Sequence, residues 1–338
     1  MDGAPQRATF YELQAENRRN SVLLLVGFLA LVLFLGLGLD VFLLGWTPGG
    51  DAGFGVPLAT PFALLFGVVH AAHSWFAGAS QVLSSTQARP ADPNDPAERQ
   101  FINVVEEMAI ASGLPKPATW VVPDPDPNAF AVGRDPAHAA IAVTRGLLET
   151  LDRDELQGVV AHEMSHVRNL DIRAMTLVTA LFGAAALLSD VARRGLYHSG
   201  GSGRGSSRRS GEGGGGGGMA ILFLAWLLVA VLAPFVTRLL ALAVSRSREY
   251  LADASSVELT RNPLGLAAAL RKIGAAHHPT QLIAQGSAHL CITDPRGWRV
   301  NEHEGEAAEW FGTHPPLAKR IAILEGMAGV VAPPSPRA

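Results

Sequence analysis

Cysteine and charged residues are scarce in this chain of 338 residues. Its one cysteine, Cys291, excludes a disulfide scaffold and implies no oxidising compartment. Charged residues make up 17% of the chain and hydrophobic residues 48%, whereas soluble domains average roughly 25% charged. This deficit of charge indicates membrane segments. A net charge of -3 gives no reason to expect a nucleic-acid partner.

Two apolar stretches near the N-terminus predict a membrane hairpin over residues 21–83. A polar segment, residues 1–20, precedes the first stretch, which runs from Ser21 to Trp46 and is interrupted only by Asp40. The second covers residues 55–83. Each is long enough for the roughly 30 Å hydrocarbon core of a bilayer. The first is too long for the apolar part of a cleaved signal peptide, so we expect a retained membrane helix.

Two further apolar stretches suggest a second hydrophobic hairpin over residues 172–244. They cover residues 172–192 and 219–244, and the residues between them, 199–218, are almost all Gly, Ser and Arg. That composition is typical of a flexible linker. An RNA-binding Arg/Gly tract is the alternative, although the segment is short and lacks aromatic residues. The pattern leaves open whether this hairpin crosses the bilayer.

The remaining sequence predicts a catalytic domain in two parts, residues 84–171 and 245–329, followed by a disordered tail over residues 330–338. The expected fold class is mainly α with a small β-sheet, in an integral membrane protein with about four hydrophobic helices. The expected elements of the domain are helices over 97–112, from 153 onward, over 264–273 and after Pro316, and strands over 119–122 and 138–144.

The sequence His162-Glu163-Met-Ser-His166 contains the strongest chemical signal. Residues four apart share one face of a helix, so both imidazoles can reach one point. This pattern is typical of a zinc site in which the glutamate accepts a proton from water. The helix predicted to contain this motif begins with a capping-box pattern, with Asp152 as the expected N-cap and Glu155 three residues later.

No proline follows this helix until Pro234, so it is expected to run on into residues 172–188. On such a helix Ile172, the start of the third apolar stretch, lies about 9 Å beyond His166. The proposed site therefore lies close to the membrane surface.

A catalytic zinc site needs a third protein ligand and leaves one position open. Glu249 is the best candidate, because it directly follows an apolar stretch as His166 directly precedes one. Asp253, one turn later, is placed to hold the ring N–H of a ligand histidine. The alternative for Glu249 is a surface salt bridge with Arg246 or Arg248.

Several ordered motifs together resemble the HtpX family of membrane zinc metallopeptidases over roughly residues 20–325. They are Asn128-Ala-Phe-Ala-Val-Gly, Gly146-Leu-Leu-Glu, Asp154-Glu-Leu, Ala161-His-Glu-Met-Ser-His, Asp171, Ser245-Arg-x-x-Glu-x-x-Ala-Asp253, and Thr313-His-Pro-Pro with Arg320. The resemblance implies a zincin-like endopeptidase of membrane-protein quality control. It implies one Zn²⁺ per chain, bound by His162, His166 and Glu249, with Glu163 as the general base.

Other residues are expected to assist the reaction or to support the site. His314 and Arg320 are candidate donors to the oxyanion, or else belong to a helix N-terminal packing motif with a structural salt bridge. Asn128 and Ala129 are expected on an edge strand that pairs with an extended peptide substrate. Asp171 either supports a metal ligand from behind or is a charge on the helix face.

The distribution of arginine predicts which side of the membrane holds the site. Arg7, Arg18 and Arg19 precede the first hairpin and its connecting loop lacks Arg and Lys, which places the catalytic part in the cytoplasm at the cell membrane. The arginines of residues 193–217 disagree with this orientation if the second hairpin crosses the bilayer, because their loop would then lie outside the cell. The expected partners are protein or peptide substrates and the lipid bilayer.

Two other functions compete with the endopeptidase. A prenyl-protein protease of the related CAAX type would share the metal motifs but have more membrane spans. A zinc-containing membrane scaffold without catalysis is disfavoured, because a structural zinc site is usually closed by four protein ligands and has no need of a base such as Glu163.

Overall fold

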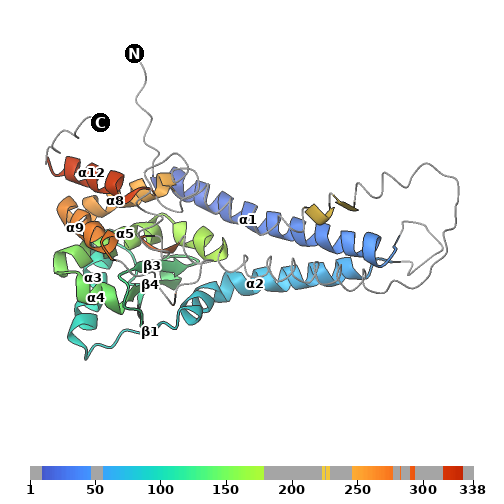
Figure 1. Ribbon diagram of the computed structural model, residues 1–338, viewed down its shortest axis with the longest axis horizontal. Coiled ribbons are helices and arrows are strands. Elements are labelled where there is room, and N and C mark those ends of the chain that lie inside the picture. Colours follow the sequence, from blue (N-terminus) through green and yellow to red (C-terminus); the bar gives the residue numbers. More distant parts are fainter. Residues whose placement is uncertain are drawn as a thin grey trace, which may run out of the picture. The chain divides into compact units, whose positions relative to one another are not determined.

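The computed structural model describes residues 10–46, 56–178, 223–224, 226–228, 246–276, 282, 290–293 and 315–329. The chain divides into two compact units. The first comprises Met1–Ser21, Trp75–Thr179 and Leu240–Ala338, and the second comprises Val22–Ser74 and Ala180–Leu239. In the part that is described, the fold is mostly helical with one small mixed sheet, as the sequence predicted (Figure 1).

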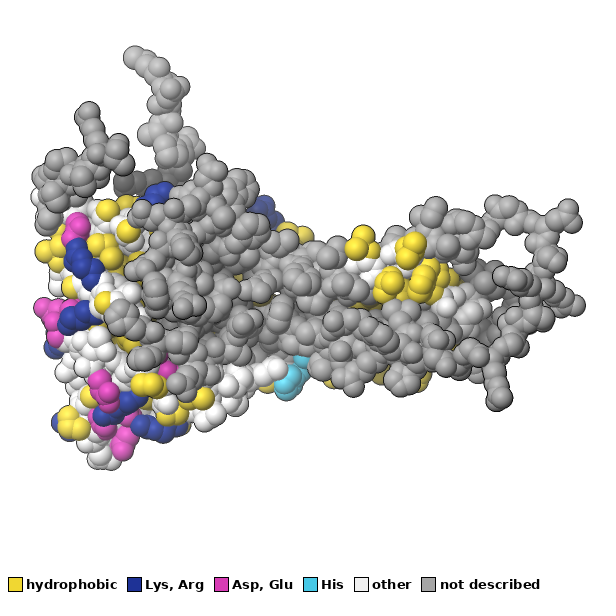
Figure 2. All heavy atoms as spheres, in the orientation of Figure 1, with side chains coloured by type: hydrophobic (Ala, Val, Ile, Leu, Met, Phe, Trp, Pro, Cys, Tyr) yellow, Lys and Arg dark blue, Asp and Glu magenta, His cyan; other side chains and the backbone are white. Residues whose placement is uncertain are grey.

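Two long helices contain the predicted first hairpin. α1 is Phe10–Gly38, extended by a π-helical turn over Leu39–Leu43, and α2 is Ala59–Ser85. Asn17–Phe42 and Ala59–Ser85 are long and apolar enough to cross a membrane. Many of their large hydrophobic side chains are exposed, for example Val26, Phe62 and Val69. Yellow side chains gather over the described surface of the second unit in Figure 2, as expected of a surface that contacts lipid.

The acidic residue in the first apolar stretch has a structural role. Asp40 Oδ1 accepts hydrogen bonds from the backbone N–H groups of Leu58 and Ala59, at 2.8 and 2.7 Å. Its Oδ2 accepts from the backbone N–H and the hydroxyl of Thr60, at 2.7 and 2.6 Å. Asp40 therefore satisfies the unpaired N–H groups that begin α2 and opposes the positive end of that helix.

The sheet of the first unit has the strand order β1-β2-β4-β3, with β1 at Arg89–Pro90, β2 at Ala118–Val122, β3 at Ala129–Gly133 and β4 at Ala139–Thr144. β2 and β4 are parallel, whereas β1 and β3 lie antiparallel to their neighbours. β3 is thus an edge strand, as predicted. β1 is not among the strands that the sequence predicted.

Alternating side chains of the strands enter two separate cores. Ala131, Ile141 and Val143 pack on one face with the apolar residues of α3 (Pro96–Ser112) and α5 (Arg153–Arg168). Phe130 and Ala142 pack on the other face with the end of α2 and with Cys291. The sheet is therefore covered on both faces, and the single cysteine is a buried core residue.

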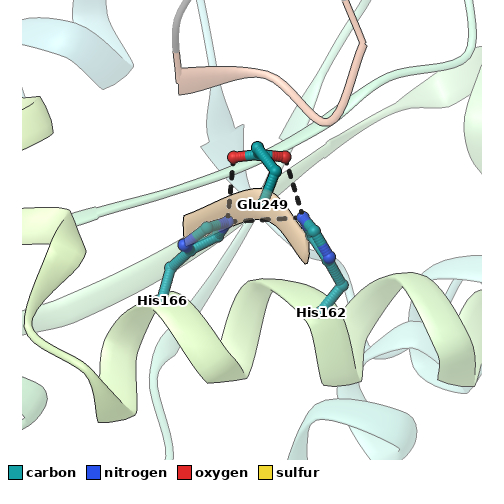
Figure 3. A group of neighbouring side chains, drawn as sticks. All are labelled: His162, His166 and Glu249. Atoms are coloured by element: carbon teal, nitrogen blue, oxygen red, sulfur yellow. Dashed lines mark hydrogen bonds and ion pairs between the residues drawn. The ribbon is translucent and has the colours of Figure 1, made fainter. Parts of the chain in front are cut away.

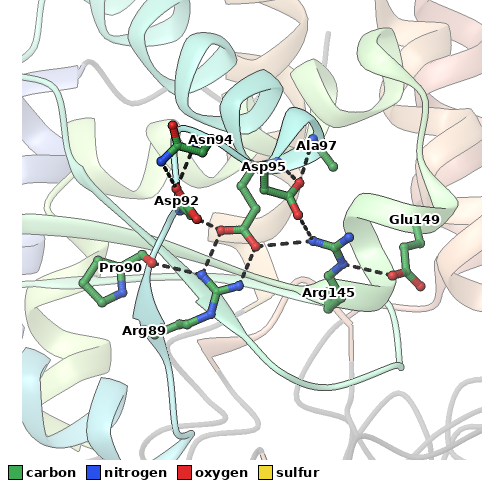
Figure 4. A network of polar contacts seen from close by, with 9 residues as sticks. Arg89, Pro90, Asp92, Asn94, Asp95, Ala97, Arg145 and Glu149 are labelled. Carbon is green, nitrogen blue, oxygen red and sulfur yellow. Dashed lines mark hydrogen bonds and ion pairs between the residues drawn. The ribbon is translucent and has the colours of Figure 1, made fainter.

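A polar network ties β1 to the helices α3 and α4 (Arg145–Thr150) in the first unit (Figure 4). Glu98 is fully buried and accepts two hydrogen bonds from Arg89, at 2.8 and 2.6 Å. It also accepts from Arg145 and from the backbone N–H of Asp92. Asp95, the N-cap of α3, receives a further bond from Arg145 at 2.8 Å.

The motif helix α5 begins as predicted, with the capping box of Asp152 and Glu155. The expectation that it runs on into residues 172–188 is wrong. α5 ends at Arg168, and Leu170 adopts a left-handed φ of 63° before the chain is helical again over 171–178. Such a φ is strained for a residue with a branched side chain. The break turns Asp171 back toward α5.

Three more helices complete the described part of the first unit: α8 (Arg246–Thr260), α9 (Pro263–Gly274) and α12 (Leu317–Met327). α9 and α12 agree with the predicted helices. α5 packs between its neighbours, and a Cβ on Gly158 would lie only 2.7 Å from the backbone nitrogen of Leu266 in α9. Most of the predicted hairpin 172–244, its loop 199–218 and the tail 330–338 lie outside the described residues.

Candidate metal centre

Three side chains predicted to bind metal come together between α5 and α8 (Figure 3). Their candidate ligand atoms all lie within 4.8 Å of one another. Nε2 of His162 lies 3.3 Å from Nε2 of His166. The two oxygens of Glu249 lie 3.6 Å from these two nitrogens, one oxygen facing each. All three residues are buried, so the alternative of a surface salt bridge for Glu249 does not fit.

Asp253 lies behind His162. Its Oδ1 is 2.9 Å from His162 Nδ1, close enough for a hydrogen bond but not aligned for one. Burial alone would raise the pKa of Asp253. The charges of Arg320 and His162 together outweigh this effect and lower the pKa to about 2. Asp253 is therefore a carboxylate at neutral pH and favours the tautomer of His162 with the proton on Nδ1, which frees Nε2 to bind a cation.

Asp171 lies behind the second histidine. Its Oδ2 is 3.0 Å from Nδ1 of His166. Its Oδ1 accepts a hydrogen bond of 2.6 Å from Nδ2 of Asn17, on α1. Asp171 is 1% exposed, which excludes the alternative of a solvated charge on a helix face. Each candidate ligand histidine thus has a buried carboxylate at its distal nitrogen.

Glu163 follows His162 on α5 and is 1% exposed. Among the described residues its Oε2 has no hydrogen-bond partner. Burial raises the pKa of this carboxyl, against the opposing effect of His162 and His166. A buried carboxylate with a raised pKa and an unused oxygen suits a group that accepts and returns a proton.

The donor set fits a zinc ion. Two imidazole nitrogens and one carboxylate form the three-ligand set of a catalytic site, which leaves a position for water or substrate. In the metal-free protein, burial lowers the pKa of His162, while Asp253 and Glu249 raise it more strongly, to about 9. His162 therefore holds a proton at neutral pH in the metal-free protein, and a bound divalent cation would take the place of that proton.

Arg320 is fully buried and extends from α12 to the same cluster. Its Nε and Nη2 donate to the two oxygens of Asp253, at 2.8 and 2.7 Å. Its Nη1 donates to the backbone oxygen of Ile292 at 2.9 Å and lies 3.7 Å from Glu249 Oε2. These bonds favour the structural salt bridge over the oxyanion role. His314 lies outside the described residues.

The predicted substrate edge is partly covered by the chain itself. Asn128 and Ala129 are both buried. Nδ2 of Asn128 donates to the oxygen of Thr293 at 3.3 Å, and the backbone N–H of Ile292 donates to the oxygen of Ala129 at 2.9 Å. An added substrate strand would have to displace these bonds or pair elsewhere on β3. The role of both residues stays a prediction.

Sequence comparison now gives the family. The model of peptidase family M48 matches residues 96–328, which include all of the cluster described above. The chain belongs to peptidase family M48. It is a membrane-bound metalloprotease that acts on protein or peptide substrates.

Relatives match the chain over almost all of its length. A protease HtpX homologue of Thermoanaerobacter pseudethanolicus is 39% identical over 326 residues, which cover 95% of this chain and 99% of the relative. A protease HtpX homologue of Caldanaerobacter subterraneus subsp. tengcongensis is 40% identical with the same coverage. The crystal structure of Ste24p from S. mikatae aligns with a TM-score of 0.47 at 18% identity, over 93% of this chain and 67% of that one.

Sequence reasoning missed two residues near the site. Asn17 lies in the polar N-terminal segment, and Arg248 was considered only as a surface partner of Glu249. Nη1 of Arg248 donates to Oδ1 of Asn17 at 3.1 Å and lies 3.6 Å from Asp171 Oδ1. Nothing in the spacing of the sequence indicated that α1 contributes to the metal centre.

Proposed function

We propose that His162, His166 and Glu249 bind one zinc ion, and that Glu163 is the general base of peptide-bond hydrolysis. The observation that carries this proposal is the convergence of the three candidate ligand atoms within 4.8 Å, in a buried site next to Glu163. When bound, zinc supplies a Lewis acid that polarises a carbonyl oxygen and acidifies water.

The residues of the chain supply the remaining steps. Asp171 holds the distal nitrogen of His166, and the carboxylate of Asp253 lies 2.9 Å from the distal nitrogen of His162, which favours an Nε2 lone pair on each histidine that faces the metal position. Glu163 accepts a proton from the attacking water and returns it to the leaving amine nitrogen. His314 is the proposed donor to the oxyanion, while Arg320 positions Asp253 and adds positive charge nearby.

The proposed substrates are membrane or misfolded proteins, cut near the cytoplasmic surface of the cell membrane as part of protein quality control. The two apolar spans support a membrane anchor. Arg18 and Arg19 are exposed at the start of the first span, which favours a cytoplasmic location for that end. We further propose that the apolar stretches 172–192 and 219–244 add a second hairpin, giving four hydrophobic helices around a zincin-like domain.

The metal site is tested on the full-length protein in detergent, with matched glutamate variants of one helix. Glu249→Gln keeps the size of the side chain but weakens it as a ligand, so zinc content is expected to fall well below one ion per chain. Glu258→Gln, on the exposed face of α8, is expected to keep the full content. Full zinc occupancy in Glu249→Gln would contradict the proposed ligand set.

The substrate class is tested with the same preparations. An unmodified membrane protein and an unfolded soluble protein are expected to be cleaved by the wild type. Clear preference for a farnesylated C-terminal peptide over both would favour the prenyl-protein protease instead.

A further inference from the structure

Asn17 lies near the start of α1, and the first candidate membrane span begins at this residue. It belongs to the same compact unit as α5 and α8. Its side chain is 3% exposed, although it is a polar group on a helix that soon becomes wholly apolar. Burying an amide without partners is costly, so its contacts indicate why it is there.

All the polar atoms of the Asn17 side chain are used. Nδ2 donates to the backbone oxygen of Asn169 at 2.8 Å and to Asp171 Oδ1 at 2.6 Å. Oδ1 accepts from Arg248 Nη1 at 3.1 Å. Two acceptors on one side and a donor on the other leave no doubt about which end of the amide is nitrogen. The amide thus joins three segments: α1, the turn after α5, and α8.

The contact to Asp171 leads directly to a candidate metal ligand. Asp171 has one oxygen on Asn17 and the other on His166 Nδ1, at 3.0 Å. With both oxygens held, the carboxylate cannot rotate away from the imidazole. Arg248, which also contacts Asn17, immediately precedes Glu249 on α8. Asn17 is therefore separated by a single residue from two of the three candidate ligands: by Asp171 from His166, and by Arg248 from Glu249.

The backbone around Asp171 needs such support. Leu170 has a left-handed φ of 63°, and the chain makes a tight turn between α5 and the helical residues 171–178. A non-glycine residue in this region is strained and persists only when its surroundings hold it. The bond from Asn17 to the oxygen of Asn169 fixes the residue before this turn, and the bond to Asp171 fixes the residue after it.

We propose that Asn17 is a positioning residue of the metal centre: it acts through Asp171 on His166, so that the start of the first membrane helix completes the zinc site. This inference rests on the proposed zinc function of His166. α1 then has two roles, as a membrane anchor and as part of the support of the active site.

The test measures the zinc dissociation constant of the full-length protein in detergent, by competition with a chelator at fixed pH. Removing a direct carboxylate partner of a ligand histidine typically weakens zinc binding about 10-fold to 100-fold, which is expected of Asp171→Ala. Asn17→Leu removes the amide at similar size, and we expect a loss of about 3-fold to 10-fold. Asn17→Ala is the second variant in case the leucine does not pack.

Ser21→Ala is the matched control. Ser21 lies one turn further along α1, is equally buried, and its hydroxyl bonds only to the backbone oxygen of Asn17 among the described contacts. Its removal is expected to leave zinc affinity unchanged. The absorption spectrum of the cobalt-substituted protein is a second readout, because it changes with ligand orientation and not with overall stability.

The deciding comparison is a double-mutant cycle. If Asn17 acts through Asp171, Asn17→Leu will weaken zinc binding in the wild type but add little in the Asp171→Ala background. An equal loss in both backgrounds, or an effect no larger than that of Ser21→Ala, would overturn the inference. Failure of the zinc proposal itself is distinguishable, because His166→Ala would then leave the wild-type affinity unchanged.

Discussion

Arg320 and Asp253 form a fully buried pair with two parallel hydrogen bonds. Nε and Nη2 of the guanidinium lie 2.8 and 2.7 Å from the two carboxylate oxygens. The same carboxylate lies 2.9 Å from His162 Nδ1. α12 is therefore tied through α8 to the metal-binding face of α5, and the pair links stability to the geometry of the site.

Replacing Arg320 with leucine is expected to destabilise the protein strongly. It would leave the carboxylate of Asp253 buried without its cation, which typically costs about 3–5 kcal/mol. Unfolding by denaturant in detergent would measure the loss. Lys319→Ala is the control, since Lys319 is exposed on the same helix and such changes usually stay within about 0.5 kcal/mol.

The pair is expected to be strongly non-additive. When Asp253 and Arg320 are both replaced by leucine, neither member of the pair is left buried without the other, so the double variant should be less destabilised than the sum of the single variants. Additive free energies of unfolding would show that the two side chains do not act as one unit. Zinc affinity would still fall, because His162 loses its carboxylate.

Zinc affinity is expected to fall as the pH is lowered. In the metal-free protein the pKa of His162 is about 9, because Asp253 and Glu249 outweigh the effect of burial. Below that pH the histidine holds a proton that zinc binding must release. The apparent affinity should therefore decrease about tenfold for each pH unit between pH 8 and 6. Chelator competition across this range measures it, and an affinity independent of pH would contradict the assignment.

Acid is expected to weaken the network around Glu98 (Figure 4). Hydrogen bonds from Arg89 lower the pKa of Glu98, against the effect of burial. A lowered pKa means that this contribution to stability is present above the ordinary carboxyl pKa near 4.3 and is lost as the pH falls through the folded value. Glu98→Gln should lower the thermal midpoint at pH 7 and reduce its further fall in acid.

Glu106→Gln provides the comparison for Glu98. Glu106 lies on the same helix and bonds to Lys116, but its side chain is 55% exposed. Exposed pairs contribute little, so this variant should follow the wild type at every pH. If both variants behave alike, the buried network does not stabilise the fold as described.

Local sequence patterns predicted much of the site because its residues obey helical spacing. His162 and His166 are one turn apart, as are Glu249 and Asp253, and the capping box of Asp152 marks the start of α5. These features depend on residues close in sequence. The same reasoning placed α9 and α12 correctly, because apolar periodicity and proline are local signals.

Long-range contacts could not be predicted in this way. Asn17 reaches Asp171 across 154 positions of sequence, and Arg320 reaches Asp253 across 67. The break after α5 was missed because Leu170 is a residue that normally avoids a left-handed φ, and no glycine or proline marks the turn. Contacts of Asn17 and Asp171 compensate for that conformation in the fold.

The most direct test of the account is zinc content and peptide cleavage, measured side by side for the wild type and Glu163→Gln in detergent. The change keeps the size of the side chain but removes the base, so we expect one zinc per chain and a loss of cleavage of about 100-fold or more. Asp154→Asn, an exposed carboxylate on the same helix, should keep both. Undiminished cleavage by zinc-loaded Glu163→Gln would contradict the assignment of Glu163 as the general base.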